Sequence, residues 1–230
     1  MQIVGHRGAA GLAPENTLFA VRTALDLGVS RIEIDIRQVD NELIVIHDET
    51  VNRTTNGKGD IHELGFKRIR RLDAGKGERI PCLAEVLKAA YPKAEVNIEI
   101  KDTSCVELLV TQLEVLEQSL PGIMKHTMVS SFLHDQLEKI RTLLPRLRRA
   151  PLVRDVQLHQ IRRFAALQPC SLNIHRRYVT PEIVNEAARY GMKTFVYTVN
   201  KRSQGRKLHH MGVFGIITDR PDIFLDEGFF

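Results

Sequence analysis

An alternation of isoleucine with charged side chains runs through residues 31–36, which read RIEIDI. Successive side chains of a β-strand point to opposite faces, so the isoleucines share one face and Glu33 and Asp35 share the other. Other short segments rich in apolar and β-branched residues predict strands at residues 2–5, 95–101, 126–131, 147–153, 171–174, 193–199 and 214–218. Segments with helical periodicity separate them, which predicts a parallel sheet with helical crossovers.

The expected helices include one over residues 17–27, capped by Asn16 and ended by Gly28. The others cover residues 83–90, 106–120, 135–144, 158–167, 181–190 and 203–210. Eight strand–helix units in 230 residues fit an α/β fold of the (β/α)8 TIM barrel type, at the compact end of its size range. A doubly wound open sheet is the alternative, and it is less favoured because no G-x-G-x-x-G follows a predicted strand.

The composition excludes several classes of protein. Hydrophobic residues make up 43% of the chain, which is too apolar for intrinsic disorder. No apolar run reaches the roughly 18 residues of a membrane span. The three cysteines have no paired spacing, and the first residues do not resemble a signal peptide, so we expect a cytoplasmic protein. We expect one domain over residues 1–230. No feature indicates an oligomeric state, and the final Phe229-Phe230 pair is either a tucked end or a contact.

Residues 43–47 form one more apolar segment, and it follows the second strand too closely for a helical crossover. A hairpin with its tip around residues 39–42 is the natural solution. Residues 38–80 then form an insertion between the second strand and its helix, rich in glycine and polar residues between 52 and 60. A loop of this length inside a compact domain is usually either functional or disordered.

Glu33 and Asp35 form the most informative pair in the chain. Two carboxylates on one face inside a barrel repel each other and lose solvation unless a cation neutralises them. Glu99 and Lys101 repeat the two-residue spacing on the next parallel strand. Three carboxylates without a thiolate suit one hard divalent cation, either Mg²⁺ or Ca²⁺. The alternative is that Glu33 and Asp35 face solvent while the isoleucines face the core.

His6 and His47 are candidates for a general acid and a general base, because imidazole titrates near neutral pH. A three-residue loop over residues 40–42 would pair His47 with Asp35 and place it beside the carboxylates. A two-residue loop would pair His47 with Ile34 and turn it away. The catalytic interpretation of His47 therefore requires an odd-numbered loop or a bulge.

Basic side chains offer two kinds of anion site. Arg7 and Lys101 are candidate phosphate ligands, the first as a planar fork and the second as a point charge. Each could instead pair only with a carboxylate, such as Glu15 or Glu99. A separate stretch holds seven arginines between residues 141 and 163. We interpret it as a solvated helix face rather than a nucleic-acid surface, because no aromatic platform is interleaved with the arginines.

Short motifs of polar residues lie along most of the chain. They are His6-Arg7-Gly8, Pro14-Glu15-Asn16-Thr17, Glu33-Ile34-Asp35, His47-Asp48, Glu99-Ile100-Lys101, Tyr197-Thr198-Val199-Asn200 and Thr218-Asp219-Arg220-Pro221. Each motif is weak alone, but in this order and spacing they resemble the glycerophosphodiester phosphodiesterase family. The resemblance implies a barrel with a small insertion after the second strand. It also implies cleavage of a glycerophosphodiester to glycerol phosphate and an alcohol.

The resemblance further implies a chemistry for the strand ends. A divalent ion would be held by Glu33, Asp35 and Glu99. His6 and His47 would share the general acid and base roles. In the family's proposed route the glycerol 2-hydroxyl of the substrate attacks phosphorus, and water then opens the cyclic phosphate. An intramolecular nucleophile has a high effective concentration, which makes this route physically reasonable.

The resemblance also implies how the substrate is held. Arg7 and Lys101 would bind its phosphate, and Glu15 would orient the loop after the first strand. Tyr197 stands where the family usually has tryptophan, and it would form one wall of the pocket, with Phe132 on the other side. This departure bears on the preferred alcohol more than on the chemistry, and the short insertion indicates an open site that accepts several alcohols.

The leading hypothesis is a metal-dependent hydrolase of small glycerophosphodiesters, such as glycerophosphocholine or glycerophosphoethanolamine, with no nucleic-acid partner. A lysophospholipase D-type activity on lysophospholipids is the second hypothesis, and the polar insertion argues against it. A non-catalytic barrel that binds phosphate or nucleic acid is the third, and it leaves the two histidines unexplained.

Overall fold

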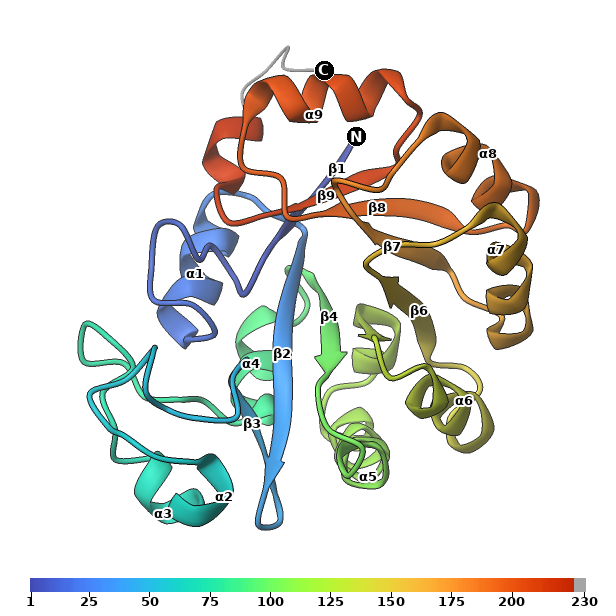
Figure 1. The fold of residues 1–230 in the computed structure, drawn as a ribbon. Coiled ribbons are helices and arrows are strands. Elements are labelled where there is room, and N and C mark those ends of the chain that lie inside the picture. The colour runs from blue at the N-terminus through green and yellow to red at the C-terminus, as the bar shows by residue number, and fades with distance from the viewer. Residues whose placement is uncertain (226–230) are drawn as a thin grey trace.

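Eight parallel strands close into a barrel within residues 1–225, the part of the chain that this computed structural model describes (Figure 1). They are β1 (Gln2–Gly5), β2 (Arg31–Val39), β4 (Glu95–Ile100), β5 (Thr127–Ser131), β6 (Arg148–Val153), β7 (Ser171–His175), β8 (Lys193–Tyr197) and β9 (Gly215–Thr218). Each pairs with the next around the barrel, and the single pair of Gly5 with Ile32 closes it between β1 and β2. The predicted TIM barrel is confirmed, while the interpretation of Phe229-Phe230 concerns residues outside the described range.

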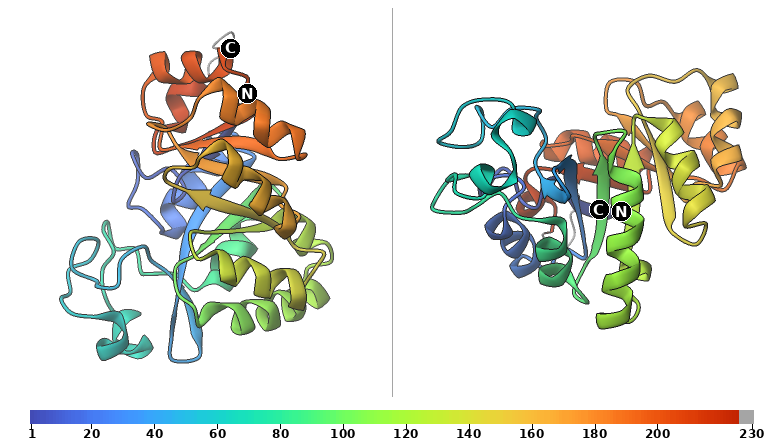
Figure 2. Two further views of the ribbon diagram at one scale, coloured as in Figure 1. Left: turned by 45° about the vertical axis from the view of Figure 1, so that its right-hand side comes forward. Right: turned by 90° about the horizontal axis from the view of Figure 1, so that it is seen from below.

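Helices on the outside of the barrel connect successive strands (Figures 1 and 2). They are α1 (Leu18–Asp26), α4 (Leu83–Ala90), α5 (Cys105–Ser119), α6 (His134–Leu143), α7 (Leu158–Phe164), α8 (Pro181–Arg189) and α9 (Arg202–His210). Short 3₁₀ helices lie at Ile123–His126, Ala165–Leu167 and Pro221–Phe224. Among residues 1–225, no helix has both the length and the apolar character needed to cross a bilayer.

Both faces of β2 are buried, for different reasons. Ile32, Ile34 and Ile36 are fully buried in a hydrophobic core that side chains of α1 and α4 also form. Glu33 and Asp35 point the opposite way, into the barrel, and are 3% and 0% exposed. The solvent-facing alternative for these carboxylates is therefore wrong, because a parallel strand in a barrel is covered on both sides.

The predicted cap of α1 is also wrong. The hydroxyl of Thr17 accepts the backbone N–H of Ala20 at 3.2 Å and so caps the helix. Asn16 instead has a left-handed backbone, with φ of 57°, and its side-chain amide donates to Asp35 Oδ2 at 2.8 Å. Both threonine and asparagine can cap a helix. The buried carboxylate of Asp35 needs a hydrogen-bond donor, which the asparagine amide supplies and which leaves the cap to Thr17.

Of the two loop lengths considered for the hairpin, the structure has the two-residue loop, whose register alone would turn His47 away from the carboxylates. Strand β3 (Glu42–Val45) pairs with the end of β2, with Val39 opposite Glu42 and Ile36 opposite Val45. The ladder ends there, because the N–H of Val45 donates to Pro81 O instead. The chain thus leaves the sheet before His47, and the strand register does not determine where that side chain points.

Residues 38–80 form a folded appendage on one side of the barrel, away from α7 and α8 (Figures 1 and 2). Besides β3 they hold two short helices, α2 (Ile61–Leu64) and α3 (Phe66–Ile69). The segment has a hydrophobic core of its own, formed by Val39, Ile44, Ile46, Val51, Ile61, Ile69, Ala74 and Ile80. A long loop was expected to be either functional or disordered. The structure shows a segment packed around its own core, which excludes the second expectation.

The arginine-rich stretch is a solvated helix face only in part, because Arg162 and Arg163 are exposed on α7 whereas two other arginines lie in a strand. Arg148 lies in β6 and pairs with Glu95 at 2.9 Å. Arg149, only 3% exposed, donates from Nε to the carbonyl of Leu167 at 2.6 Å and from Nη1 to that of Leu147 at 2.9 Å. The prediction failed at Arg149. It assumed that every arginine in the stretch faces solvent, whereas backbone carbonyl groups can satisfy the donors of a buried guanidinium.

Candidate active site

Three carboxylates meet inside the barrel near the ends of β2 and β4. The parallel pairing of these strands places Asp35 opposite Glu99, and Glu33 lies two residues earlier on the same face. One oxygen from each of the three side chains lies within 4.8 Å of the other two. All three residues are buried. We call Glu33, Asp35 and Glu99 the carboxylate cluster.

Two basic side chains compensate part of this negative charge. Arg7 Nε lies 3.1 Å from Asp35 Oδ2, and Lys101 Nζ lies 3.0 Å from Asp35 Oδ1 while also contacting Glu99. Burial alone would raise the pKa of Asp35, but Lys101 and Arg7 outweigh it and lower the pKa to about 2. Asp35 is therefore the charged centre of the cluster, and both predicted phosphate ligands also pair with it.

Glu33 and Glu99 are less well compensated. Burial, followed by the negative charge of Asp35, raises the pKa of Glu33 to about 8 and also raises the pKa of Glu99. Glu33 Oε1 is buried and has no hydrogen-bond partner among residues 1–225. A buried oxygen without a partner is costly, and an all-oxygen donor set matches a hard divalent cation. The residues of the carboxylate cluster therefore fit the predicted ion.

His6 is oriented by a carboxylate from the other end of the chain. Its Nδ1 donates to Asp219 Oδ1 at 2.5 Å, and its Nε2 lies 3.9 Å from Glu33 Oε2. The amide of Asn200 donates to the second oxygen of Asp219. Burial lowers the pKa of His6, but the hydrogen bond to Asp219 and the charge of Glu33 outweigh it, so the net shift is upward.

His47 has the same arrangement, and it lies close enough to Asp35 for the two charges to interact. Its Nδ1 donates to Asp48 Oδ1 at 2.6 Å. Partial burial lowers its pKa, and Asp35 and Asp48 oppose this shift without cancelling it. A carboxylate on Nδ1 fixes the ring and the tautomer, so Nε2 of each histidine is left to exchange protons with a substrate.

The turn after β1 places Arg7. This residue has a left-handed backbone with φ of 51°, its N–H donates to Glu33 Oε2 at 3.0 Å, and its Nη1 donates to Glu15 Oε1 at 2.6 Å. Gly8 follows with φ of 84°, and a Cβ atom there would lie 2.6 Å from the carbonyl carbon of Ala20. The sequence His6-Arg7-Gly8 is thus required by the turn as well as by its side chains.

Arg53, in the appendage, is a site residue that the sequence analysis missed. Its Nε donates to Asp48 Oδ2 at 2.6 Å, and its Nη1 donates to Glu15 Oε2 at 2.7 Å. It therefore links the carboxylate that orients His47 to the carboxylate that holds Arg7. No spacing rule marks a loop arginine, whereas Asp219 was detectable, because it follows the last strand within a recognised motif.

Phe132 and Tyr197 pack against each other at the barrel end that carries the carboxylate cluster. They come from the ends of β5 and β8, and their ring centroids lie 6.1 Å apart in an edge-to-face arrangement. The hydroxyl of Tyr197 donates to the carbonyl of Val153 at 2.8 Å, while Phe132 is 45% exposed. The two rings are therefore in contact with each other at this end of the barrel.

Comparison with known proteins places this arrangement in a family. The model of the glycerophosphoryl diester phosphodiesterase family matches residues 6–223. The chain belongs to this family. It is accordingly an enzyme of the phosphodiester hydrolase class, which sets aside the hypothesis of a non-catalytic barrel.

Individual members of the family resemble the chain over nearly their whole length. A glycerophosphodiester phosphodiesterase from Caldanaerobacter subterraneus subsp. tengcongensis is 33% identical over 97% of this chain and 96% of its own. The structure of an Oleispira antarctica phosphodiesterase in complex with the product sn-glycerol-3-phosphate matches with a TM-score of 0.86 and 28% identity, covering 97% and 94% of the two chains. A glycerophosphodiester phosphodiesterase from Agrobacterium tumefaciens matches with a TM-score of 0.82 and 30% identity, covering 98% and 99%.

Proposed function

We propose that the protein hydrolyses small glycerophosphodiesters, such as glycerophosphocholine and glycerophosphoethanolamine, to glycerol 3-phosphate and an alcohol. The observation that carries the proposal is the carboxylate cluster flanked by two histidines, each oriented by a carboxylate of its own. The product named for the Oleispira relative supports glycerol 3-phosphate as the product here. Residues 1–230 would act as one domain with residues 38–80 as its insertion. The three free cysteines support a cytoplasmic location.

One divalent ion, Mg²⁺ or Ca²⁺, would be held by Glu33, Asp35 and Glu99. When bound, it would polarise a phosphoryl oxygen and offset the charge that develops there. Arg7 and Lys101 lie against the same carboxylates and carry donors that match phosphate oxygens. Glu15 would keep the guanidinium of Arg7 in place through its 2.6 Å hydrogen bond.

His6 and His47 would move the protons of both steps. One accepts the proton of the substrate's glycerol 2-hydroxyl as its oxygen bonds to phosphorus, and the other protonates the departing alcohol oxygen. Water then opens the cyclic phosphate with the two roles exchanged. Positioned acid–base groups of this kind contribute about 10²–10⁴-fold to rate. Tyr197 and Phe132 would line the path of the alcohol without closing it, so several alcohols would be accepted.

The experiment measures glycerol 3-phosphate released from glycerophosphocholine by the protein and by its His6→Gln and His47→Gln variants. Each variant is expected to lose about 10³-fold in kcat. The variant His62→Gln, in the exposed helix α2, is the matched control and should retain full activity. An unchanged kcat in either active-site variant would remove that histidine from the mechanism. A substrate that lacks the 2-hydroxyl should not turn over, and undiminished turnover would mean that water attacks phosphorus directly.

A lysophospholipase D-type activity is the second candidate, because Phe132 and Leu133 leave apolar surface exposed at the end of β5. An assay of choline release from lysophosphatidylcholine and from glycerophosphocholine tests it. Release of choline at a rate close to that from glycerophosphocholine would favour this candidate, and release below a hundredth of that rate would exclude it.

A further inference from the structure

Three exposed arginines stand at the barrel end that carries the proposed site. Arg154 follows directly after β6, and Arg176 and Arg177 follow directly after β7. Within residues 1–225, none of the three forms an ion pair with a carboxylate. We call Arg154, Arg176 and Arg177 the arginine cluster. Guanidinium groups gathered without carboxylate partners create a positive potential that attracts anions.

The arginine cluster is built around Tyr197. The ring of His175, the last residue of β7, lies 5.6 Å from the ring of Tyr197. The hydroxyl of Tyr197 donates to the carbonyl of the residue that precedes Arg154. Arg176 Nη1 donates at 3.3 Å to the carbonyl of Thr198, the residue that follows Tyr197. The arginine-bearing segments therefore flank the Tyr197 ring, at the barrel end that carries the carboxylate cluster.

Neighbouring titratable groups respond to this positive charge. Partial burial lowers the pKa of His175, and the charges of the arginine cluster lower it further. Burial and the nearby charge of Glu99 raise the pKa of Tyr197, whereas Arg154 opposes that rise. Tyr197 thus lies between a negative region, the carboxylate cluster, and a positive one, the arginine cluster.

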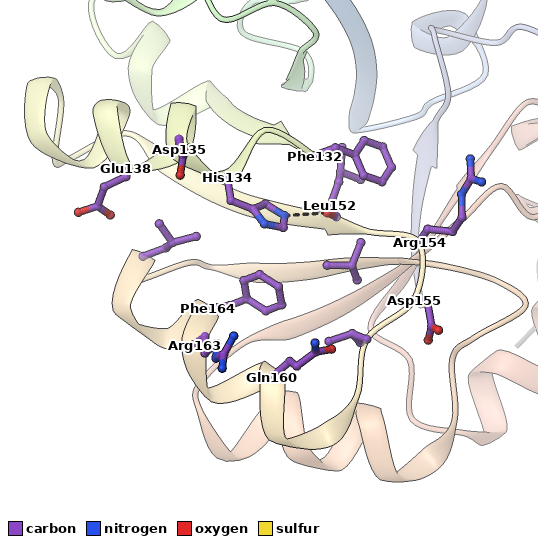
Figure 3. Close-up of a pocket in the computed structure, with 13 residues that line it drawn as sticks. Phe132, His134, Asp135, Glu138, Leu152, Arg154, Asp155, Gln160, Arg163 and Phe164 are labelled. Carbon is purple, nitrogen blue, oxygen red and sulfur yellow. Dashed lines mark hydrogen bonds between the residues drawn. The ribbon is translucent and has the colours of Figure 1, made fainter.

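There is open space on the same side of the barrel. A cavity of about 600 Å³ lies between α6 and α7, and both Phe132 and Arg154 line it (Figure 3). In Figure 3 the guanidinium of Arg154 rises on the side of Phe132, whereas Asp155 points the opposite way. Asp135 and Glu138 also line the cavity, but they lie on α6 at the end away from Arg154, so a group that extends past Phe132 toward Arg154 would meet a guanidinium.

We propose that the arginine cluster is a second anion subsite, which binds a negatively charged group on the alcohol part of the substrate. This inference rests on the proposed function. The phosphodiester would lie at the carboxylate cluster, the alcohol would pass Tyr197, and its anionic group would reach the arginine cluster. Guanidinium forks match phosphate oxygens closely. The preferred substrate class is therefore a glycerophosphodiester whose alcohol carries a phosphate monoester.

The experiment compares kcat/KM for glycerophosphoglycerol and for the same diester with a terminal phosphate monoester, both followed by phosphorus NMR at low ionic strength. The protein should prefer the phosphate-bearing substrate by about tenfold, the order expected for charge-assisted hydrogen bonds. Raising the salt concentration should shrink the preference, since the arginines are exposed.

The double variant Arg154→Gln/Arg177→Gln should lose this preference. The matched control is Arg146→Gln/Arg189→Gln, which removes the same charge just before β6 and β8, at the opposite end of the barrel. The control should keep the preference. Equal loss in both double variants would mean that net charge alone attracts the substrate, and would overturn the subsite.

Other outcomes separate the inference from the function on which it rests. Equal kcat/KM for the two substrates in the unmodified protein would overturn the subsite and leave the proposed function intact. Hydrolysis of neither substrate would overturn both. The arginines could instead bind a lipid surface. In that case the unmodified protein would sediment with phosphatidylglycerol vesicles, the cluster variant would not, and the unmodified protein would show no substrate preference. This result would also overturn the subsite.

Discussion

At the scale of single residues, charge balance is what gives the site its chemistry. The carboxylate cluster holds three acidic groups against two cations, and the least compensated oxygen belongs to Glu33. The raised pKa of Glu33, about 8, means that this carboxyl binds a proton at neutral pH when no ion is present. An ion that takes Glu33 as a ligand must therefore displace a proton.

The affinity for Ca²⁺ or Mg²⁺ should consequently rise as the pH increases through neutrality toward about 8, where Glu33 loses its proton. Calorimetric titration in buffers of different ionisation enthalpy should detect a released proton. The variant Glu33→Gln should bind the ion more weakly and release none. An affinity that stays constant across this pH range would contradict the assignment of Glu33.

The sequence predicted the residues that carry the charges and two of their partners, Glu15 for Arg7 and Glu99 for Lys101, but not the partner Asp35 that both share. The period of a strand and the motif order were enough to find Glu33, Asp35 and Glu99. Asn16 was predicted to cap α1, but its side chain instead donates to Asp35. Asparagine is suited to both roles, so the residue type alone could not distinguish them. His47 lies near Asp35 without the odd-numbered loop that its catalytic interpretation required, since the chain leaves the ladder before it.

At the scale of elements, the appendage over residues 38–80 contributes to the site through Arg53. This guanidinium bonds to Asp48 and Glu15, which in turn orient His47 and Arg7. Because half of the Arg53 side chain is exposed, its removal should cost little stability. The appendage is thus a positioning element for both flanks of the site.

The variant Arg53→Gln should lower kcat by about tenfold and shift the acid limb of its pH profile, because Asp48 then loses a charge-assisted partner. Lys58→Gln, an exposed change in the same segment, should leave kcat and the profile unaltered. Arg53→Lys should recover part of the activity. If kcat and the pH profile of Arg53→Gln match those of the unmodified protein, the appendage has no positioning role.

A second element-scale prediction concerns Arg149, which joins β6 to the segments on either side of it. Replacing it with methionine leaves the carbonyls of Leu167 and Leu147 without their donor. The free energy of unfolding should fall by about 2 kcal/mol, as for other buried groups left without a partner. Urea unfolding measures this, with exposed Arg146→Met as the control. Equal unfolding midpoints for the two variants would contradict it.

At the scale of the whole molecule, the alternation of strands and helices was sufficient to predict the barrel, because eight parallel strands joined by helical crossovers leave few other solutions. Burial of Arg149 and the link made by Arg53 could not be predicted, since both depend on which loops come together across the barrel. Ion binding should stabilise this whole assembly, because only the folded barrel brings β2 and β4 together.

The melting temperature should therefore rise by several degrees when Ca²⁺ or Mg²⁺ is added at about one hundred times its dissociation constant, and fall again with EDTA. Glu33→Gln should show a much smaller rise at the same ion concentration. A melting temperature that does not respond to either ion would argue against a cation site in the folded barrel.

The central claim is that this phosphodiesterase acts through an ion held by Glu33, Asp35 and Glu99. The most direct measurement is glycerol 3-phosphate release from glycerophosphocholine in EDTA, followed by return of excess Mg²⁺ or Ca²⁺, for the unmodified protein and Glu33→Gln. We predict that EDTA abolishes the activity, and that at least one ion restores it in the unmodified protein but not in Glu33→Gln. Full activity in EDTA, or full recovery in Glu33→Gln, would contradict the claim.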